Sequence, residues 1–404
     1  MADHRDDEVL RIDRPATGGG VGRLADGLVI FVRDSLPGEL VEVSVTDRTS
    51  SFARGVVREV IETSEQRVTP PCRFSGDGGC GGCDLQHASE AAQRSWKEAV
   101  VEEQLRRVAG LEYSPALVQA PSPAKGSRTR LRCAVDGDGR LALRASRSHS
   151  LVAVDPCWLV DERVVDAFAT SWSWAEEVEL RAIGDGEPFA VVKRRTGRTS
   201  RIEVCSLRGD RLDPAPISRV AVGGTHYNVS PVSFWQAHVD APSMLLERVL
   251  TLSGAERGDR VIDLYSGVGL FAVGLASAVG SIGRVVAVES SPHAVRDARE
   301  NGAGHRTLRV RQSMVSPGVV ANLVGPEDVV VVDPPRAGLA KGVARAIADA
   351  RPRRIVYISC DAATFSRDLK VFLSSGFSLS HLEILDLFPM TEHVELVALL
   401  DMTP

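Results

Sequence analysis

The chain has no apolar run long enough to span a bilayer, and its first residues, MADHRDDEVL, lack the apolar core of a signal peptide. These absences argue against a membrane segment and against export, so we expect a cytoplasmic protein. No internal repeat or low-complexity tract interrupts the 404 residues. Cysteine is scarce, with seven residues. In a reducing compartment, clustered cysteines are more often metal ligands or catalysts than disulfide partners.

An excess of positive charge is missing as well, because the formal net charge is −5. A nucleic-acid partner therefore has to be bound by local basic patches rather than by the field of the whole molecule. Two stretches qualify, although each can also be read as an ordinary solvated face. They are Lys125, Arg128, Arg130 and Arg132, and Lys193, Arg194, Arg195, Arg198 and Arg201.

The length is too great for one ordinary core and predicts several domains. Short β-type runs separated by turn signals fill residues 8–62 and predict a small closed barrel of OB type, the domain 1–65. A cysteine-rich loop and a helix make up residues 66–115. Ser89 is the expected N-cap of this helix and Gly110 its stop.

Residues 116–222 hold several strand-like runs without βαβ order and predict a small central α+β domain. In the remaining domain, 223–404, strands alternate with helical runs from about residue 243. The strand-like runs are VIDLYSG, VVAVE, VVVVD and RIVYIS. This alternation predicts an α/β fold with a parallel, doubly wound sheet.

In such a sheet, ligands bind beyond the carboxyl ends of the strands. VIDLYSGVG ends one strand and turns through Gly267 and Gly269 into a helix, and Glu289 ends the next strand. Glycine also serves ordinary turns, but here the acid lies at the distance expected for hydrogen bonds to a ribose. The chain has no GKS-type phosphate-binding tail on this turn, which favours a nucleoside cofactor such as S-adenosylmethionine over ATP.

YISCDAATF places Cys360 at the end of an apolar strand and directly before a helix start, while VVVVDPPR places Asp333 at the same rim. A cysteine after an apolar run is by itself usually core filler. Here the helix N-terminus is predicted to stabilise the thiolate and to lower its pKa from the free value of about 8.5. Cys360 is therefore a candidate nucleophile.

Four motifs, in this order, resemble those of the RNA uracil-5-methyltransferases: DLYSGVG, DPPRAGL, SCDAATFSRD and FPMTEHVE. Upstream, SPVSFWQ resembles the SPxxFxQ element of that family, and residues 8–62 resemble its RNA-binding TRAM domain. The resemblance covers nearly the whole chain. It implies a class I, Rossmann-like methyltransferase domain, RNA-binding N-terminal and central domains, and methyl transfer from S-adenosylmethionine to C5 of a uridine in ribosomal RNA or tRNA.

Position by position, the resemblance implies that Cys360 adds to C6 of uracil and that Glu395 removes the C5 proton. The implied cofactor contacts are Gln236, Tyr265, Glu289 and Asp333, with Gly267 of the glycine turn beside them. Three positions depart from the family pattern. Asp361 and His238 stand where the family has asparagine, and Met390 where it has histidine. A carboxylate at position 361 would oppose ionisation of the neighbouring thiol.

PCRFSGDGGCGGC places Cys72, Cys80 and Cys83 close together and predicts a metal site. The resemblance adds Cys157 as a fourth ligand and implies a [4Fe-4S] cluster that clamps the RNA-binding domains. Zinc is the alternative, since four thiolates satisfy either. The separation of Cys72 from Cys80 is longer than the family pattern. The two cysteines in strand-like runs are expected in the core: Cys133 and Cys205.

Two other functions stay open at this point. A methyltransferase acting on the exocyclic amine of adenine also carries a proline-rich motif, but its chemistry needs no cysteine nucleophile. An RNA-binding protein in which the altered positions have silenced catalysis would bind RNA without methyl transfer. The sequence indicates no obligate protein partner and no membrane partner.

Overall fold

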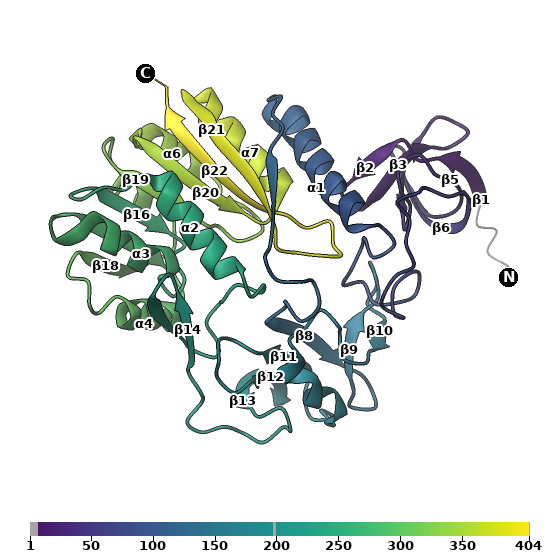
Figure 1. Ribbon diagram of the computed structural model, residues 1–404, viewed down its shortest axis with the longest axis horizontal. Coiled ribbons are helices and arrows are strands. Elements are labelled where there is room, and N and C mark those ends of the chain that lie inside the picture. Colours follow the sequence, from purple (N-terminus) through teal and green to yellow (C-terminus); the bar gives the residue numbers. More distant parts are fainter. Residues whose placement is uncertain (1–6, 197–198, 404) are drawn as a thin grey trace. The chain divides into compact units, whose positions relative to one another are not determined.

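The computed structural model describes residues 7–196 and 199–403, which form two compact units (Figure 1). The first unit runs up to Glu103 and also includes two later segments, Ala142–Val154 and Phe388–His393. The second unit comprises Gln104–Leu141, Asp155–Leu387 and the chain from Val394 onward. The predicted domain boundaries at residues 65, 115 and 222 stay predictions.

The first unit begins with a six-stranded sheet in the order β1-β5-β6-β4-β3-β2. Neighbouring strands are antiparallel except for β4 and β6. Register shifts between β5 and β6 bend these long strands, and Leu10, Ile30, Val41 and Val43 fill the interior. The predicted small β-barrel is confirmed. Its strands are β1 (Asp7–Arg11), β2 (Arg14–Ala16), β3 (Gly19–Arg23), β4 (Val29–Arg33), β5 (Leu40–Arg48) and β6 (Ala53–Glu62).

A helix follows the cysteine-rich loop, as predicted. Helix α1 (Glu90–Gln104) continues as a π-helical turn over Leu105–Ala109. The hydroxyl of Ser89 accepts a hydrogen bond from the backbone N–H of Ala92 at 3.2 Å, and Gly110 ends the helix with a φ of 71°. The first unit also contains β10 (Leu151–Ala153) and, from Ala142 onward, its antiparallel partner β9 (Leu141–Arg144).

The second unit contains an antiparallel arrangement of β8, β11, β12 and β13 with one buried face. Cys133 and Cys205 lie on that face and are fully buried, which confirms the prediction that they belong to the core. Arg198 and the side chain of Arg195 lie outside the described residues. The elements are β8 (Arg130–Val135), η2 (Glu162–Ala169), β11 (Glu177–Arg181), β12 (Phe189–Thr196), β13 (Thr199–Cys205), β14 (Ser218–Val222) and β15 (Thr225–Val229).

The large sheet of this unit has the strand order β18-β17-β16-β19-β20-β22-β21-β7. The pairings from β18 to β20 are parallel, whereas β22 runs antiparallel to both of its neighbours. The strands are β7 (Ala116–Gln119), β16 (Arg260–Leu264), β17 (Arg284–Glu289), β18 (Leu308–Gln312), β19 (Val329–Val332), β20 (Arg354–Ser359), β21 (Phe377–Asp386) and β22 (Glu395–Met402).

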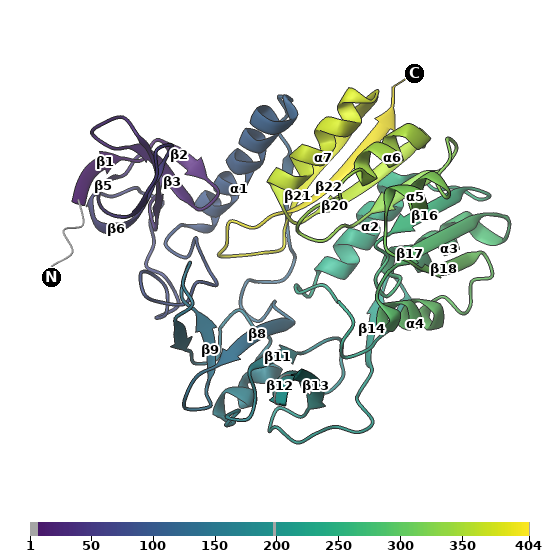
Figure 2. The ribbon, with the colours of Figure 1, turned by 180° about the vertical axis from the view of Figure 1, so that it is seen from behind.

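Helices cover both faces of this sheet, with α2 in front in Figure 1 and α6 and α7 in front in Figure 2. The predicted α/β fold with a doubly wound sheet is confirmed. The strand order reverses between β16 and β19, where ligands bind in such folds. The helices are α2 (Ala241–Ser253), α3 (Leu270–Val279), η3 (Gly280–Ile282), α4 (Pro292–Asn301), α5 (Pro317–Ala321), α6 (Val343–Ala350) and α7 (Ala362–Ser374). Among the described residues, no helix has the length and apolar composition needed to cross a bilayer.

Candidate active site

The predicted catalytic residues meet at the carboxyl edge of the large sheet. Asp333 directly follows β19 and Cys360 directly follows β20. Glu395 opens β22, which pairs antiparallel with β20 so that Leu396 lies opposite Ser359. This register brings Glu395 beside Cys360, although the two residues are far apart in the chain. Strand pairing therefore assembles a thiol and two carboxyl groups at one place.

The glycine turn after β16 is held by the end of β17. The backbone N–H groups of Tyr265 and Ser266 donate to the carbonyl of Val288 at 2.9 and 3.1 Å. Tyr265, with a φ of 65°, takes a left-handed conformation that side chains rarely adopt. One carboxylate oxygen of Glu289 accepts the N–H of Gly267 at 3.1 Å. The turn and the predicted ribose-binding acid thus form one fixed structure at the crevice.

Three carboxyl groups around the crevice hold their protons more tightly than usual. Loss of hydration raises the pKa of Asp333 to about 7. Burial, and then the charge of Asp333, raises the pKa of Glu395 well above its ordinary value. The pKa of Asp263, on β16, is raised for the same two reasons. Neither carboxylate oxygen of Asp263 has a hydrogen-bond partner within the described residues. A cationic ligand would therefore be stabilised here.

The thiol of Cys360 is half-buried, and its pKa is raised to about 11. Burial is the main cause, followed by the charges of Glu395 and Asp333, while Arg336 opposes them. The prediction of a lowered pKa is therefore wrong for the protein without ligands. Asp361 contributes to the reason, because its carboxylate accepts the N–H of Thr364 at 2.8 Å and caps α7 itself. The partial positive charge of the helix N-terminus is thus directed to Asp361.

Helix α7 also clamps the DPPRAGL loop, residues 333–339. The carboxylate of Asp368 accepts hydrogen bonds from the N–H of Leu339 at 2.9 Å and from the hydroxyl of Tyr357 at 2.8 Å. The guanidinium of Arg367 donates to two carbonyl groups of the loop at 3.2 Å. We did not assign these helix residues a role from the sequence, although their position about two helical turns after Cys360 is a usable signal.

A second support that sequence reasoning missed is Asp297, a buried residue of α4. Its carboxylate accepts hydrogen bonds from the N–H of Ser230 at 2.9 Å, from the hydroxyl of Ser230 at 2.5 Å and from that of Ser233 at 2.6 Å. These contacts fix the SPVSFWQ segment. The hydroxyl of Thr129 fixes its end by donating to the carbonyl of Gln236 at 3.1 Å.

His238, one of the departures, is buried, and burial lowers its pKa. Its Nδ1 accepts the backbone N–H of Asp240 at 3.2 Å. The imidazole is therefore neutral at pH 7 and shapes the backbone of its own loop. A structural role for this position follows from these contacts.

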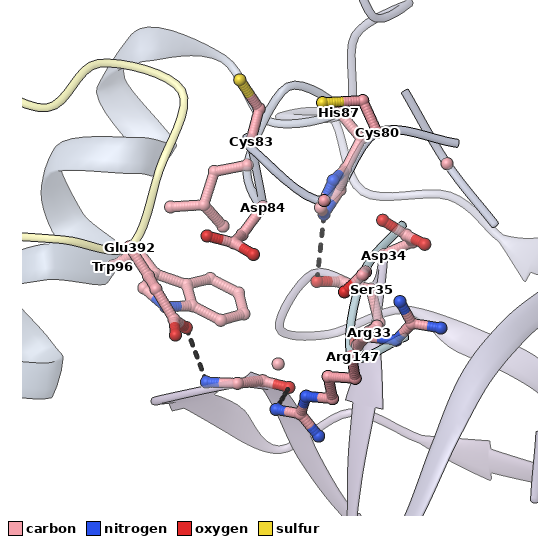
Figure 3. Close-up of a pocket in the computed structure, with 16 residues that line it drawn as sticks. Arg33, Asp34, Ser35, Cys80, Cys83, Asp84, His87, Trp96, Arg147 and Glu392 are labelled. Atoms are coloured by element: carbon pink, nitrogen blue, oxygen red, sulfur yellow. Dashed lines mark hydrogen bonds between the residues drawn. The ribbon is translucent and has the colours of Figure 1, made fainter. Parts of the chain in front are cut away.

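The cysteine loop lines a cavity of about 210 Å³ in the first unit (Figure 3). Cys80, Cys83, Asp84 and His87 are among the residues that line it, together with residues of the barrel. Across residues 7–196 and 199–403, however, no three histidine, cysteine or acidic residues are gathered closely enough to hold a metal ion. Within these ranges the structure therefore presents no preformed set of ligands for a cluster. The seven cysteines, all of them described, form no disulfide.

Comparison with known proteins adds family relationships to this geometry. Residues 326–403 match the family described as tRNA (Uracil-5-)-methyltransferase, residues 226–353 the methyltransferase small domain, and residues 9–57 the TRAM domain. An uncharacterized RNA methyltransferase of Streptomyces coelicolor is 37% identical, over 96% of this chain and 91% of the relative.

Two further similarities cover nearly the whole chain. The 23S rRNA (uracil(1939)-C(5))-methyltransferase RlmD of Halomonas elongata is 32% identical, over 95% of this chain and 87% of the relative. The crystal structure of the Pyrococcus abyssi tRNA (uracil-54, C5)-methyltransferase in complex with S-adenosyl-L-homocysteine is 24% identical. It superposes with a TM-score of 0.71, covering 97% of this chain and 100% of that one. This structure shares the fold.

Proposed function

This chain belongs to the RNA uracil-5-methyltransferase family and is an S-adenosylmethionine-dependent RNA methyltransferase; we propose that it methylates C5 of a uridine through a covalent adduct on Cys360. One observation carries the proposal. The strand register places Cys360 beside Glu395, with Asp333 at the same rim. A nucleophile and a base in one crevice are what substitution at C5 needs, whereas methylation of an exocyclic amine needs no thiol.

The proposed reaction begins when the thiolate of Cys360 forms a bond to C6 of the target uracil. The electron pair of the C5–C6 double bond moves toward C5 and O4 as an enolate. C5 then bonds to the methyl carbon, whose former bonding pair stays on the departing sulfur. Glu395 takes the C5 proton, the C5–C6 double bond re-forms, and the bond from C6 to sulfur breaks. Glu395 must therefore be ionised when the methyl group has been transferred.

The cofactor crevice fits a cationic nucleoside. The chemistry that S-adenosylmethionine supplies there is an electrophilic methyl group on a positively charged sulfur. Asp263 is buried without a hydrogen-bond partner among the described residues, and Asp333 carries a raised pKa, so both gain from a nearby positive charge. We propose that Glu289 binds the ribose and that the remaining contacts come from Gln236, Tyr265, Gly267 and Asp333.

The RNA is proposed to be ribosomal RNA or tRNA and to contact the barrel and the central strands. Phe234, in the same segment as Gln236, exposes 53% of its surface, and the guanidinium of Arg130 lies 5.1 Å from its ring centre. Exposed aromatic rings and arginine planes are surfaces on which unpaired bases stack. A target uridine held in a folded RNA would have to be turned out of its stack to reach Cys360.

The [4Fe-4S] cluster remains a proposal that rests on the four cysteines Cys72, Cys80, Cys83 and Cys157 and on the family resemblance, with zinc as the alternative. The described residues contain no gathered set of metal ligands, and the proposed reaction assigns the cluster no step. Protein purified without oxygen should be brown and contain about four iron atoms per chain. A colourless protein that contains zinc would replace the cluster by a zinc site, and a metal-free protein would remove both.

Cys360→Ala tests the enzyme directly. We expect the variant to lose transfer of labelled methyl groups to unmodified RNA while it still binds S-adenosylhomocysteine, because the thiol makes the bond to C6. Wild-type protein should form an adduct with RNA containing 5-fluorouridine, which has no C5 proton to release, and the variant should not. Normal turnover of the variant would refute the mechanism. RNA binding by the wild type without methyl transfer would instead identify a silenced relative, the alternative that the raised thiol pKa favours.

A further inference from the structure

The loop between β21 and β22 contains a segment of the first unit, although both strands belong to the second unit. Residues 388–393 pack within the first unit, with the barrel, the cysteine loop and α1, whereas β22 belongs to the second unit. Glu395, the first residue of β22, follows this segment after a single intervening residue. Residues 388–393 and Glu395 are therefore joined through Val394 alone, so a displacement of the segment can reach the backbone of Glu395 along the chain.

Helix α1 holds the inner side of this loop through two buried polar side chains. The ammonium group of Lys97, which is fully buried, donates to the carbonyl of Phe388 at 2.9 Å. The amide of Gln93 accepts the N–H of Met390 at 2.9 Å and directs its Nε2 toward the sulfur of Met390 at 3.3 Å. Burying an ammonium group is costly. The hydrogen bond to the loop carbonyl offsets part of that cost and attaches α1 to the loop.

Met390 is the point at which several contacts converge. Its φ of 65° is a left-handed conformation that a side chain rarely adopts without support. Gln93 binds its N–H, and its carbonyl accepts the N–H of Leu85 from the cysteine loop at 3.0 Å. The methionine that replaces the histidine of the family is therefore held from two segments.

The barrel holds the outer side of the loop. The carboxylate of Glu392 accepts the N–H of Gly18, in the turn between β2 and β3, at 2.6 Å (Figure 3). The carbonyl of the same glycine accepts a hydrogen bond from Arg147 at 3.4 Å. Gly18 has a φ of 91°, and an added Cβ would clash with Arg147, so this turn requires glycine. The barrel turn is thus fixed against the loop.

We propose that Lys97 and Gln93 are positioning residues that set the general base Glu395 for removal of the C5 proton, an inference that rests on the proposed function. A base has to lie within hydrogen-bonding distance of the proton that it takes, and displacement by about 1 Å can cost about a hundredfold in rate. Proton removal is the step that lets the thiol leave. A displaced Glu395 should therefore leave formation of the adduct intact and slow its resolution, so that methylated RNA stays bound to Cys360.

Lys97→Met and Gln93→Leu test the proposal, because both keep the approximate shape and remove the contacts to the loop. For each variant we would measure methyl-transfer kcat and KM on natural-uridine RNA, the fraction of enzyme bound covalently to RNA on denaturing gels, and affinity for S-adenosylhomocysteine. We expect kcat to fall at least tenfold, the covalent fraction to rise several-fold and cofactor affinity to stay unchanged. Glu395→Gln should show the same pattern in stronger form. Glu90→Gln, an exposed change on the same helix, is the matched control and should behave as wild type.

Glu392→Ala supplies a second variant outside the core, in case the buried changes prevent folding. It should show the same rise in covalent fraction, to a smaller extent. Unchanged kcat and covalent fraction in the folded variants would overturn the positioning role. Loss of both adduct formation and cofactor binding would also overturn it, because that result is expected if Lys97 and Gln93 only support the folded structure. If Cys360→Ala keeps its activity, or the wild type forms no adduct with 5-fluorouridine RNA, the proposed function itself fails.

Discussion

At the residue scale, the proposed chemistry depends on a thiol that resists ionisation. A pKa of about 11 leaves only about one Cys360 in ten thousand as thiolate at pH 7. The same carboxyl groups that raise this pKa would attract the cationic cofactor. Binding of a cation would in turn lower the pKa of the thiol. A bound methyl donor would therefore oppose the rise in the pKa of Cys360 that the two carboxylates cause.

The raised pKa of Cys360 predicts how its thiol responds to alkylation. In protein without cofactor, the rate at which iodoacetamide modifies Cys360 should rise about tenfold per pH unit from pH 7 to pH 10, because only the thiolate reacts. Glu395→Gln should raise the rate at a pH at which Glu395 is ionised in the wild type, since a negative charge beside the thiol is then removed. Mass spectrometry of the Cys360 peptide measures both. A rate that levels off below pH 8 would contradict the raised pKa.

The raised pKa of Asp333 predicts that the stability of the folded protein depends on pH. Its pKa in the folded protein, about 7, lies above the ordinary value of 3.8, so the folded state keeps a proton that the unfolded state has released. Between about pH 4 and pH 7 this residue makes the free energy of unfolding fall as pH rises. Asp333→Asn removes the effect. The Tm of the variant minus the Tm of the wild type should be larger at pH 8 than at pH 5, as measured by thermal unfolding without cofactor. An equal Tm difference at both pH values would contradict it.

At the element scale, α7 links the proposed nucleophile, Cys360, to the proposed cofactor rim at Asp333. Asp361 begins the helix beside Cys360, and Arg367 and Asp368, further along it, hold the loop that contains Asp333. Both sides of the crevice are thereby attached to one rigid helix. Displacement of the loop should affect cofactor binding more than it affects the thiol.

Gly338→Ala tests this link. Gly338 has a φ of 73°, and an added Cβ would lie 2.5 Å from a guanidinium nitrogen of Arg367 and 2.8 Å from the carboxylate of Asp368. We expect a loss of about 1–3 kcal/mol in the free energy of unfolding and weaker S-adenosylhomocysteine binding. Gly318→Ala is the control, because an added Cβ meets nothing within 4 Å there. Urea unfolding measures the free energy of unfolding, and calorimetry measures the affinity for S-adenosylhomocysteine. Equal values for Gly338→Ala and Gly318→Ala would refute the role of α7 in holding the loop.

At the scale of the whole molecule, a net charge of −5 means that RNA has to be recognised locally. On the more exposed face of the central strands, Arg132 lies opposite Glu179 and Lys193 opposite Glu177. The acidic partners keep the basic side chains in place. Glu179 also pairs with Arg181, so it stays compensated when Arg132 is removed.

The double variant Arg132→Gln/Lys193→Gln should therefore fold normally and bind RNA several-fold more weakly. If both side chains contact phosphates, the slope of log affinity against log salt should become shallower by about 1.4. Fluorescence anisotropy over a series of salt concentrations measures this slope, and S-adenosylhomocysteine affinity should not change. Arg345→Gln, an exposed change on α6, is the control. An unaltered salt slope would remove this face from the RNA-binding surface.

The sequence by itself determined the fold class and the candidate site residues. Alternating strands and helices, the turn at Gly267 and the motif around Cys360 are local patterns, because side-chain periodicity and turn chemistry act between near neighbours in the chain. For the same reason the start of α1 was predictable from Ser89, and the end of its π-helical continuation from Gly110. The barrel was predictable from short alternating strands.

Only the tertiary structure decided how these parts act on one another. The pairing of β20 with β22 brought Glu395 beside Cys360, and the direction of the thiol pKa followed from that neighbourhood and opposed the prediction from the helix alone. The support that Lys97 gives to the loop before Glu395 was likewise invisible in the sequence. Burial and electrostatic fields depend on distance through space, and these residues are distant along the chain.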